Sequence, residues 1–364
     1  MSTRTPAPGP AGAQAKAIFG VKPKAVDDGF KGDTKNRIII RHLVRPLMKW
    51  LEHPEVEEIQ INRPGEVVQR LRYEVDGSVY VYHQDEELTR RYLTMVAHAV
   101  ANNQNMSGFG ADQNPVVYGQ LPGGHRFVAA IGQNIQYHDN EIDEFGSICM
   151  VIRQFTEQNN ISVKNYGIEA GKRLEGRRFA GLSKAVDDDK DPYSQIFNSL
   201  ARGDHILISG ATGTGKTTLM RALLGKIDER YRVITVEDTR EIVVPHRNHC
   251  HIVLDRAGSS NNFDYKSVVD LIVRVTPDVV MAGEISTKNA AAIWELMRSG
   301  HGHFMTTIHA TTTDEALETF MTRISHTMPG EVADRERVRT EMRKTLRVIQ
   351  IERVGEKRKI VEIA

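Results

Sequence analysis

The chain has 364 residues, which is enough for two ordinary domains with separate hydrophobic cores. Its 48 Lys and Arg residues are balanced by 47 Asp and Glu residues, and the net charge of +1 excludes a global electrostatic attraction to nucleic acid or acidic lipid. The 2 cysteines, Cys149 and Cys250, are too few and too far apart for a disulfide framework, so a reducing compartment fits best.

The N-terminal stretch, residues 1–36, is rich in Ala, Pro, Gly and Lys and has no hydrophobic period. Such a composition buries too little surface to order itself, so we predict a flexible tail. The tail lacks the apolar core of a signal peptide, and no stretch of the chain is apolar enough to span a bilayer. We therefore expect a soluble, cytoplasmic protein.

Residues 37–155 mix helical and strand patterns and predict an α+β N-terminal domain. Apolar residues at helical spacing run from residue 37 to 51, with a break at Pro46. A second helical pattern covers 87–104. Short strands bounded by turn signals are predicted at 56–61, 67–73, 78–82, 116–120 and 126–131.

Residues 156–191 carry several glycines, a basic cluster and an acidic run without a sustained period. This composition is typical of a linker.

Residues 192–364 alternate predicted strands with predicted helices. The strands are expected at 205–209, 233–237, 251–254, 279–282 and 304–308, and the helices at 217–227, 265–275, 289–299 and 314–324. A charged helix after residue 331 and a hairpin of 346–353 with 359–363 close the chain. The alternation predicts a mostly parallel sheet, and so an α/β fold class for this larger domain.

The first strand of this domain runs into the glycine-rich turn of HILISGATGTGKTT, residues 205–218, which predicts a P-loop. Backbone N–H groups of such a loop point at phosphate, Lys216 adds a positive charge, and the hydroxyl of Thr217 is suited to Mg²⁺. The predicted nucleotide-binding residues are Gly210, Ala211, Thr212, Gly213, Thr214, Gly215, Lys216, Thr217 and Thr218.

Three further candidates each follow a predicted strand, at the sheet edge where open α/β sheets bind their ligands. Glu237 ends the strand 233–237 and would hold Mg²⁺ or a water in its shell. Glu284 follows the strand 279–282 and would coordinate Mg²⁺ or orient the attacking water. His309, in the segment 300–310, would sense the γ-phosphate. Taken singly, an acid after a buried strand is more often a helix N-cap, and the histidines could be loop histidines. The P-loop upstream reverses this preference for Glu284.

The order of these motifs resembles the Walker A, Asp box, Walker B and His box of the secretion traffic ATPases, which serve type IV secretion, type II secretion and type IV pili. The resemblance covers about residues 51–364. In the first domain, LEHPEVEEIQINRPGE at 51–66 and LPGGHR at 121–126 are similar to the type IV secretion branch in particular.

This resemblance implies a RecA-like P-loop ATPase domain in a homohexameric ring, with ATP and Mg²⁺ bound between the two domains. It implies Glu284 as the catalytic acid, supported by Lys216, Glu237 and His309, and Thr217, Glu284 and Glu237 as the Mg²⁺ site. It also implies that Arg126 and Arg153 complete the phosphate site, where guanidinium groups neutralise a transferring phosphoryl group.

The implied location is the cytoplasmic periphery of the bacterial inner membrane. The implied partners are other type IV secretion components and a secreted protein or DNA complex, without sequence-specific nucleic-acid binding. Three alternatives stay open: a type II secretion or pilus-retraction motor, a nucleotide-gated docking switch with little hydrolysis, and a DNA-translocating motor with a local basic surface.

One further cluster, PHRNHCH at 245–251, brings His246, His249, Cys250 and His251 close together in sequence. The spacing suits no standard zinc module, so we interpret it as a loop that leads into a strand, with metal binding as the alternative.

Overall fold

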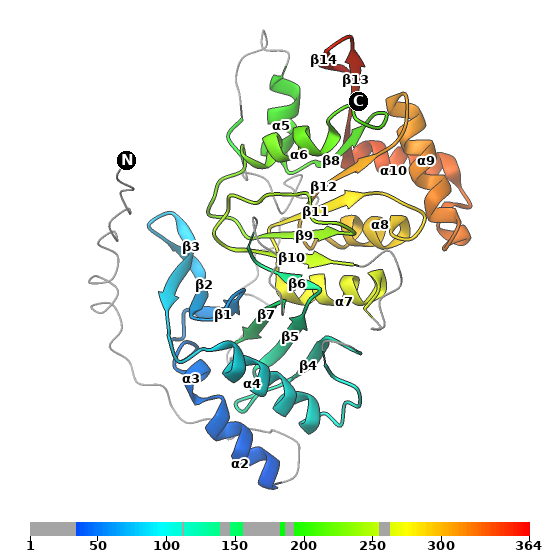
Figure 1. Cartoon of the computed structure of the whole chain (residues 1–364). Helices are drawn as coiled ribbons and strands as arrows, with labels where there is room; N and C mark the ends of the chain where they lie inside the picture. The colour runs from blue at the N-terminus through cyan, green and yellow to red at the C-terminus, as the bar shows by residue number, and fades with distance from the viewer. Residues whose placement is uncertain (1–33, 111–112, 139–145, 156–182, 186–192, 255–262) are drawn as a thin grey trace, which may run out of the picture.

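The computed structural model describes residues 34–110, 113–138, 146–155, 183–185, 193–254 and 263–364 (Figure 1). The predicted tail therefore lies outside the described residues, except that helix α2 (Thr34–Leu43) already begins within its last residues. Most of the predicted linker also lies outside them. Below, residues 34–155 are called the N-terminal part and residues 193–364 the C-terminal part.

The N-terminal part contains an antiparallel sheet of 6 strands in the order β3-β2-β1-β7-β5-β4. Its strands are β1 (Val56–Ile61), β2 (Glu66–Val75), β3 (Ser78–Gln84), β4 (Val116–Gln120), β5 (Arg126–Gly132) and β7 (Ser147–Arg153). All but β7 were predicted. Strand β7 is buried along nearly its whole length and carries no alternation of apolar and polar residues, so it lacks the usual strand signal.

Both faces of this sheet are covered, which explains the continuous apolar sequence of β5 and β7. Phe127, Ala129 and Ile131 face one core, whereas Val128 and Ala130 face the other. Helix α4 (Arg90–Asn103) packs on the first face and helix α7 (Tyr265–Val275) of the C-terminal part on the second. The N-terminal part is therefore fixed to the C-terminal part by a shared hydrophobic core.

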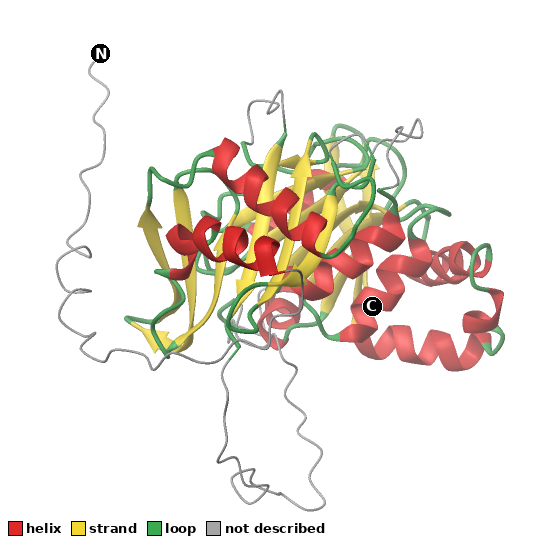
Figure 2. Cartoon of the chain, turned by 90° about the horizontal axis from the view of Figure 1, so that it is seen from below, coloured by secondary structure: helices red, strands yellow, loops and turns green. Residues whose placement is uncertain are grey.

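Helix α4 is capped by Thr89, whose side chain accepts a hydrogen bond from the backbone N–H of Tyr92. The predicted break at Pro46 is confirmed, because α2 ends at Leu43 and a separate short helix, α3 (Arg45–Met48), starts with the proline in its first turn. Figure 2 shows the helices of this part against the strands of its sheet.

The C-terminal part is built on a sheet of 8 strands in the order β14-β13-β8-β12-β11-β9-β10-β6. The strands are β8 (His205–Ser209), β9 (Val233–Glu237), β10 (His249–Val253), β11 (Val279–Glu284), β12 (His303–Ile308), β13 (Leu346–Val354) and β14 (Lys357–Ile363), joined by β6 (Ile135–Gln136) of the N-terminal part. The neighbours from β13 to β10 are parallel, and the two edge strands, β14 and β6, are antiparallel.

Helices cover this sheet and follow its strands in chain order. They are α5 (Ser194–Arg202), α6 (Lys216–Leu224), α7, α8 (Ala290–Ser299), α9 (Thr313–Ser325), the short 3₁₀ helix η3 (Pro329–Val332) and α10 (Arg335–Thr345). The predicted α/β fold class, with a smaller α+β part in front, is confirmed. Among the described helices, none is long and apolar enough to cross a bilayer.

A fully buried arginine ties the two parts together beside the shared core. Arg232, immediately before β9, donates from Nη1 to Oε1 of Gln60 on β1 at 2.6 Å and to Oδ1 of Asn248 at 3.1 Å. Its Nη2 lies 3.7 Å from Sγ of Cys149 on β7. Buried polar groups need such partners, so this contact fixes the start of β9 against the N-terminal part.

Candidate nucleotide site

Strand β8 and helix α6 hold the P-loop between them, as predicted. Gly213 and Gly215 have φ angles of 77° and 90°, a region that side chains with a Cβ rarely adopt. Helix α6 begins at Lys216, directly after Gly215. The first N–H groups of a helix have no partner within it, so this end of α6 presents free donors and the positive end of its dipole to the loop.

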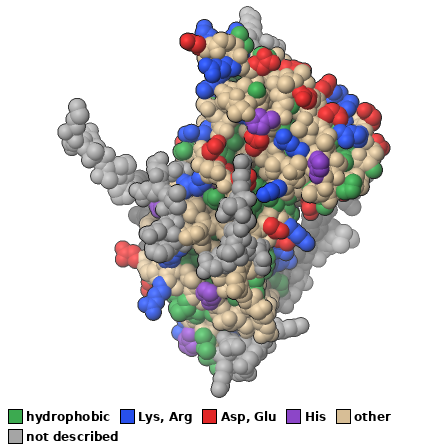
Figure 3. Space-filling model, turned by 45° about the vertical axis from the view of Figure 1, so that its right-hand side comes forward, with side chains coloured by type: hydrophobic (Ala, Val, Ile, Leu, Met, Phe, Trp, Pro, Cys, Tyr) green, Lys and Arg blue, Asp and Glu red, His purple; other side chains and the backbone are tan. Residues whose placement is uncertain are grey.

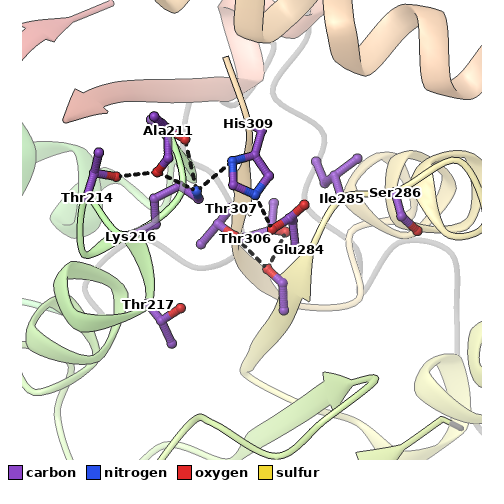
Figure 4. Close-up of polar contacts among 12 residues, drawn as sticks. Ala211, Thr214, Lys216, Thr217, Glu284, Ile285, Ser286, Thr306, Thr307 and His309 are labelled. Atoms are coloured by element: carbon purple, nitrogen blue, oxygen red, sulfur yellow. Dashed lines mark hydrogen bonds and ion pairs between the residues drawn. The ribbon is translucent and has the colours of Figure 1, made fainter. Parts of the chain in front are cut away.

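Lys216 is buried, and its ammonium group rests on the loop itself. Nζ donates to the carbonyl oxygens of Gly210 at 2.9 Å and Ala211 at 3.2 Å, and lies 3.1 Å from Nδ1 of His309 (Figure 4). Burial lowers the pKa of Lys216, whereas the nearby Glu284 carboxylate raises it. Lys216, the residue predicted to bind phosphate, therefore places its ammonium group against the first residues of the P-loop.

His309 connects the P-loop to the end of strand β11. Its Nε2 lies 2.8 Å from Oε2 of Glu284, whose side chain is 38% exposed and faces the loop. Thr306 and Thr307 on β12 both donate to the carbonyl oxygen of Gly283, which holds the end of β11 in place. The backbone oxygen of Glu284 accepts from Nδ2 of Asn289 at 2.8 Å.

Glu237 is buried at the end of β9 and points at the backbone rather than at open space. Oε1 accepts from the N–H groups of Glu241 and Ile242, both at 2.9 Å, and Oε2 accepts from the hydroxyl of Thr235 at 3.2 Å. Burial raises the pKa of Glu237 to about 7, against the effect of these hydrogen bonds. The carboxylate thus shapes the turn 237–242 and thereby places Glu241.

A cavity of about 440 Å³ opens over these groups. It is lined by the P-loop, by the ends of β9, β11 and β12, and by residues from other segments. The lining residues are Thr212, Gly213, Gly215, Lys216, Thr217, Thr218, Met220, Val236, Glu237, Asp238, Thr239, Glu241, Ile242, Tyr265, Gly283, Glu284, Asn289, Thr307, His309 and Arg358. Of the predicted loop residues, Gly210, Ala211 and Thr214 stay outside the lining. The first two supply carbonyl oxygens to Lys216, and the third donates to Ala211.

Arg126 and Arg153 lie elsewhere in this conformation, since neither lines the cavity. They face each other as register partners on β5 and β7. Arg126 is exposed, and Arg153 donates from Nη2 to Oε1 of Glu57 at 2.6 Å. The described lining comes entirely from the C-terminal part, so the structure does not bring these arginines to the P-loop of the same chain.

The cavity also contains residues that the sequence interpretation did not single out. Asp238 accepts a hydrogen bond from the phenol of Tyr265, and Glu241 Oε2 lies 3.5 Å from Oγ1 of Thr217. Glu241 lies four residues after Glu237 in the same acidic segment, so the sequence could have indicated it as a further candidate. Arg358 comes from strand β14, far along the chain, and has no motif to mark it.

The oxygen groups of this cavity fit Mg²⁺, which prefers hard oxygen ligands and keeps several waters. The hydroxyl of Thr217 and the carboxylates of Glu241 and Glu284 share the lining. Glu237 fits a direct ligand less well, because both of its oxygens already accept hydrogen bonds from the protein.

The histidine-rich segment 245–251 forms a loop and the start of β10. The ring nitrogens of His249 lie 2.5 Å from the carbonyl oxygen of His246 and 2.7 Å from that of Tyr137. Nδ1 of His251 lies 2.7 Å from Oγ1 of Thr235. Within the described ranges, no group of at least 3 His, Cys, Asp or Glu residues is arranged to hold a metal ion.

Comparisons with known proteins identify the family of this chain. The family profile of the type II/IV secretion system proteins matches residues 33–350. Protein VirB11 of Rhizobium radiobacter is 26% identical over 310 residues, which cover 80% of this chain and 83% of the relative. The type IV secretion system protein VirB11 of Bartonella quintana (strain Toulouse) is 28% identical over 351 residues, covering 89% and 92%.

The fold is similar to the crystal structure of the VirB11 ATPase from the Brucella suis type IV secretion system in complex with sulphate. The TM-score is 0.72 at 23% identity, and the match covers 91% of this chain and 95% of the other. Together with the profile match and the P-loop cavity, this confirms the resemblance read from the motifs: the chain belongs to the type II/IV secretion system protein family, as a secretion ATPase.

Proposed function

We propose that this protein hydrolyses MgATP as a homohexamer and uses the free energy to power assembly of, or substrate transfer through, a bacterial type IV secretion system. The observation that carries this proposal is the convergence of Lys216, Glu284 and His309 on one cavity at the mouth of the P-loop. The similarity to VirB11 proteins of type IV secretion systems supports the choice of machine.

In the proposed reaction, the phosphate chain of ATP takes the place that the Gly210 and Ala211 carbonyls now hold around Lys216 Nζ. The ammonium group and the free N–H groups of α6 then hold the phosphates. Glu284, which is partly exposed and faces the loop, orients the water that attacks the γ-phosphate. His309 orients Glu284 from the other side.

Mg²⁺ would be held by Thr217, Glu241 and Glu284, and when bound it neutralises charge on the phosphates. Glu237 would support the Mg²⁺ site indirectly, because its hydrogen bonds fix the turn that carries Glu241. Arg126 and Arg153 would reach the phosphates of a neighbouring subunit in the ring, because neither of them lines the cavity of its own chain. Guanidinium groups at that point stabilise the transferring phosphoryl group.

A ring of this kind would work at the cytoplasmic periphery of the inner membrane, with other secretion components and a protein or DNA cargo as partners. Movement of the N-terminal part against the C-terminal part would couple hydrolysis to the cargo, and it would have to open the hydrophobic core that the two parts share in this conformation. A type II secretion or pilus-retraction motor would use the same chemistry with another partner.

Steady-state ATP hydrolysis, measured beside the oligomeric mass with and without MgATP, tests the proposal. We expect turnover by a hexamer, and its loss in both Lys216→Ala and Glu284→Gln. Lys226→Ala is the matched control, since Lys226 lies after α6 and outside the cavity lining. A hexamer that binds ATP without turnover in the wild type would instead favour the docking switch, and full turnover in Lys216→Ala would refute the assignment.

A further inference from the structure

The C-terminal hairpin β13–β14 lies directly against the P-loop. Strand β13 runs parallel to β8, with Gln350 opposite Ser209, the last residue of β8. Its remaining residues, 351–354, continue past the end of β8 and alongside the loop. The carbonyl oxygen of Ile351 lies only 2.6 Å from where a Cβ would stand at Gly210, so hairpin and loop are in close contact.

Strand β14 returns along β13 and places one arginine across the loop. The Cδ, Nε and Cζ atoms of Arg358 lie 2.8, 3.1 and 3.4 Å from the position of a Cβ built on Gly215. The side chain therefore extends over the last glycine of the loop, immediately before the N-terminus of α6. A Cβ at this position would require the Arg358 side chain to shift.

Arg358 also lies at the junction of two neighbouring cavities. It lines the nucleotide cavity together with Lys216 and Thr217, and it lines an adjoining groove of about 870 Å³ between helix α6 and strand β14. Thr218 and Gly215 are the P-loop residues common to both cavities. The phosphates of a nucleotide bound on the P-loop would therefore lie close to the guanidinium group of Arg358.

The surroundings leave the charge of Arg358 available. Among the residues that the structure describes, no carboxylate lies within ion-pair distance of it, although most of the arginines of the helical region nearby are paired in this way, as in Arg335–Glu318 and Arg343–Asp314. Figure 3 shows Lys and Arg side chains at the top of the molecule, where Figure 1 places the hairpin. An unpaired guanidinium is a fitting partner for phosphate, which it can bind with two parallel hydrogen bonds.

We propose that Arg358 is a nucleotide-binding residue whose guanidinium contacts the phosphate chain of ATP on the P-loop of the same subunit. This inference rests on the proposed function and adds a contact from the same chain to those expected of Arg126 and Arg153. The segment that carries it, β14, lies beyond residue 350, where the match to the family profile ends.

Equilibrium binding of ADP and of the non-hydrolysable analogue AMP-PNP to the full-length chain, in buffer with Mg²⁺, tests the proposal. We expect Arg358→Ala to raise both dissociation constants about tenfold, as for the loss of a charge-assisted hydrogen bond. Arg358→Lys, which keeps the charge without the planar fork, should raise them about threefold. The matched control is Lys357→Ala, which removes a charge from the neighbouring residue outside both cavities and should change them less than about twofold.

The salt dependence separates a phosphate contact from a merely structural role. Removing a direct ion pair with phosphate should make the dissociation constant of Arg358→Ala less sensitive to salt than that of the wild type. Arg358→Gln, which keeps a long polar side chain on the hairpin, serves if the alanine variant does not fold. Wild-type affinity in Arg358→Ala or Arg358→Gln, or an unchanged salt dependence, would overturn the inference while leaving the ATPase intact. A wild-type chain that binds neither nucleotide would overturn the proposed function itself.

Discussion

Nε2 of His309 lies 2.8 Å from Oε2 of Glu284, so the His-box histidine and the Walker B glutamate form a direct pair. The tautomer follows from the other ring nitrogen. The Lys216 ammonium group has only donors, so Nδ1 of His309 must accept, and Nε2 therefore carries the proton that points at Glu284. All three donors of Lys216 have partners, and an incoming phosphate must replace at least one of them.

The first prediction concerns this pair. His309→Ala leaves Lys216 its two contacts with the carbonyl oxygens of Gly210 and Ala211 but removes the group that orients Glu284. We expect kcat for ATP hydrolysis to fall about 10- to 100-fold, with KM changed by less than about threefold, because the lost contact positions the acid rather than binding ATP. His326→Ala, at an exposed histidine after α9, is the control. An unchanged kcat in His309→Ala would show that the pair has no part in turnover.

The second prediction concerns the metal. Glu241 lies 3.5 Å from the hydroxyl of Thr217 and lines the cavity. We expect Glu241→Gln to raise the Mg²⁺ concentration needed for half-maximal hydrolysis about tenfold, since a neutral amide is a poorer ligand for Mg²⁺ than a carboxylate. ATP binding in the presence of EDTA should not change. Glu229→Gln, a charge removed outside the lining, is the control, and equal Mg²⁺ curves for wild type and Glu241→Gln would contradict the assignment.

The third prediction concerns pH. Burial raises the pKa of Glu237 from 4.5 to about 7, so the folded protein binds more protons than the unfolded chain between these pH values. The free energy of unfolding therefore falls as pH rises through this window, and the fall is absent in Glu237→Gln. We expect the variant to gain roughly 3 kcal/mol relative to wild type between pH 4.5 and pH 8.

Urea unfolding of both proteins across this range measures the difference. The glutamine keeps an oxygen that can accept from the N–H groups of Glu241 and Ile242, so the turn should persist. Parallel pH profiles for the two proteins would mean that Glu237 is not held protonated by burial.

The fourth prediction concerns the N-terminal arginines. If Arg126 acts on the nucleotide of a neighbouring subunit, each site combines Glu284 of one subunit with Arg126 of the next. Arg126→Ala and Glu284→Gln then remove residues that two different subunits contribute to one site. Each variant alone should be inactive, whereas mixed rings should regain hydrolysis, because some sites then combine an intact Glu284 with an intact Arg126 from the next subunit. No recovered activity in rings shown by mass to be mixed would place Arg126 in its own subunit's site.

The fifth prediction concerns stability. Arg232 is fully buried and satisfies Gln60 and Asn248 across the contact between the two parts. Arg232→Ala should lower the free energy of unfolding by about 3 kcal/mol or more, since it leaves a cavity and buried polar groups without partners. Arg230→Ala, at a largely exposed arginine only two positions away, should change it by less than about 0.5 kcal/mol. Similar values for the two variants would refute the structural role of Arg232.

Much of the secondary structure could be read from the chain because its signals are local. Helix α7 was predicted with its observed bounds, Tyr265–Val275, and the strand before the P-loop likewise at His205–Ser209. Strand β7 was missed because burial on both faces removes the alternation on which strand prediction depends. Strand β10 starts two residues before the predicted 251, since His249 already pairs with Val233.

The sequence by itself determined the P-loop, the acid and histidine boxes and the family, because phosphate binding needs certain residue types at fixed, short spacings. Only the tertiary structure decided which of these groups meet. It joined His309 to Lys216 and Glu284, turned Glu237 toward the backbone, kept Arg126 and Arg153 away from their own loop, and laid Arg358 across Gly215. The reason is that the order of strands in the sheet, which includes the place of the predicted hairpin beside β8 and the P-loop, brings distant residues together, and this order is not encoded in a local pattern.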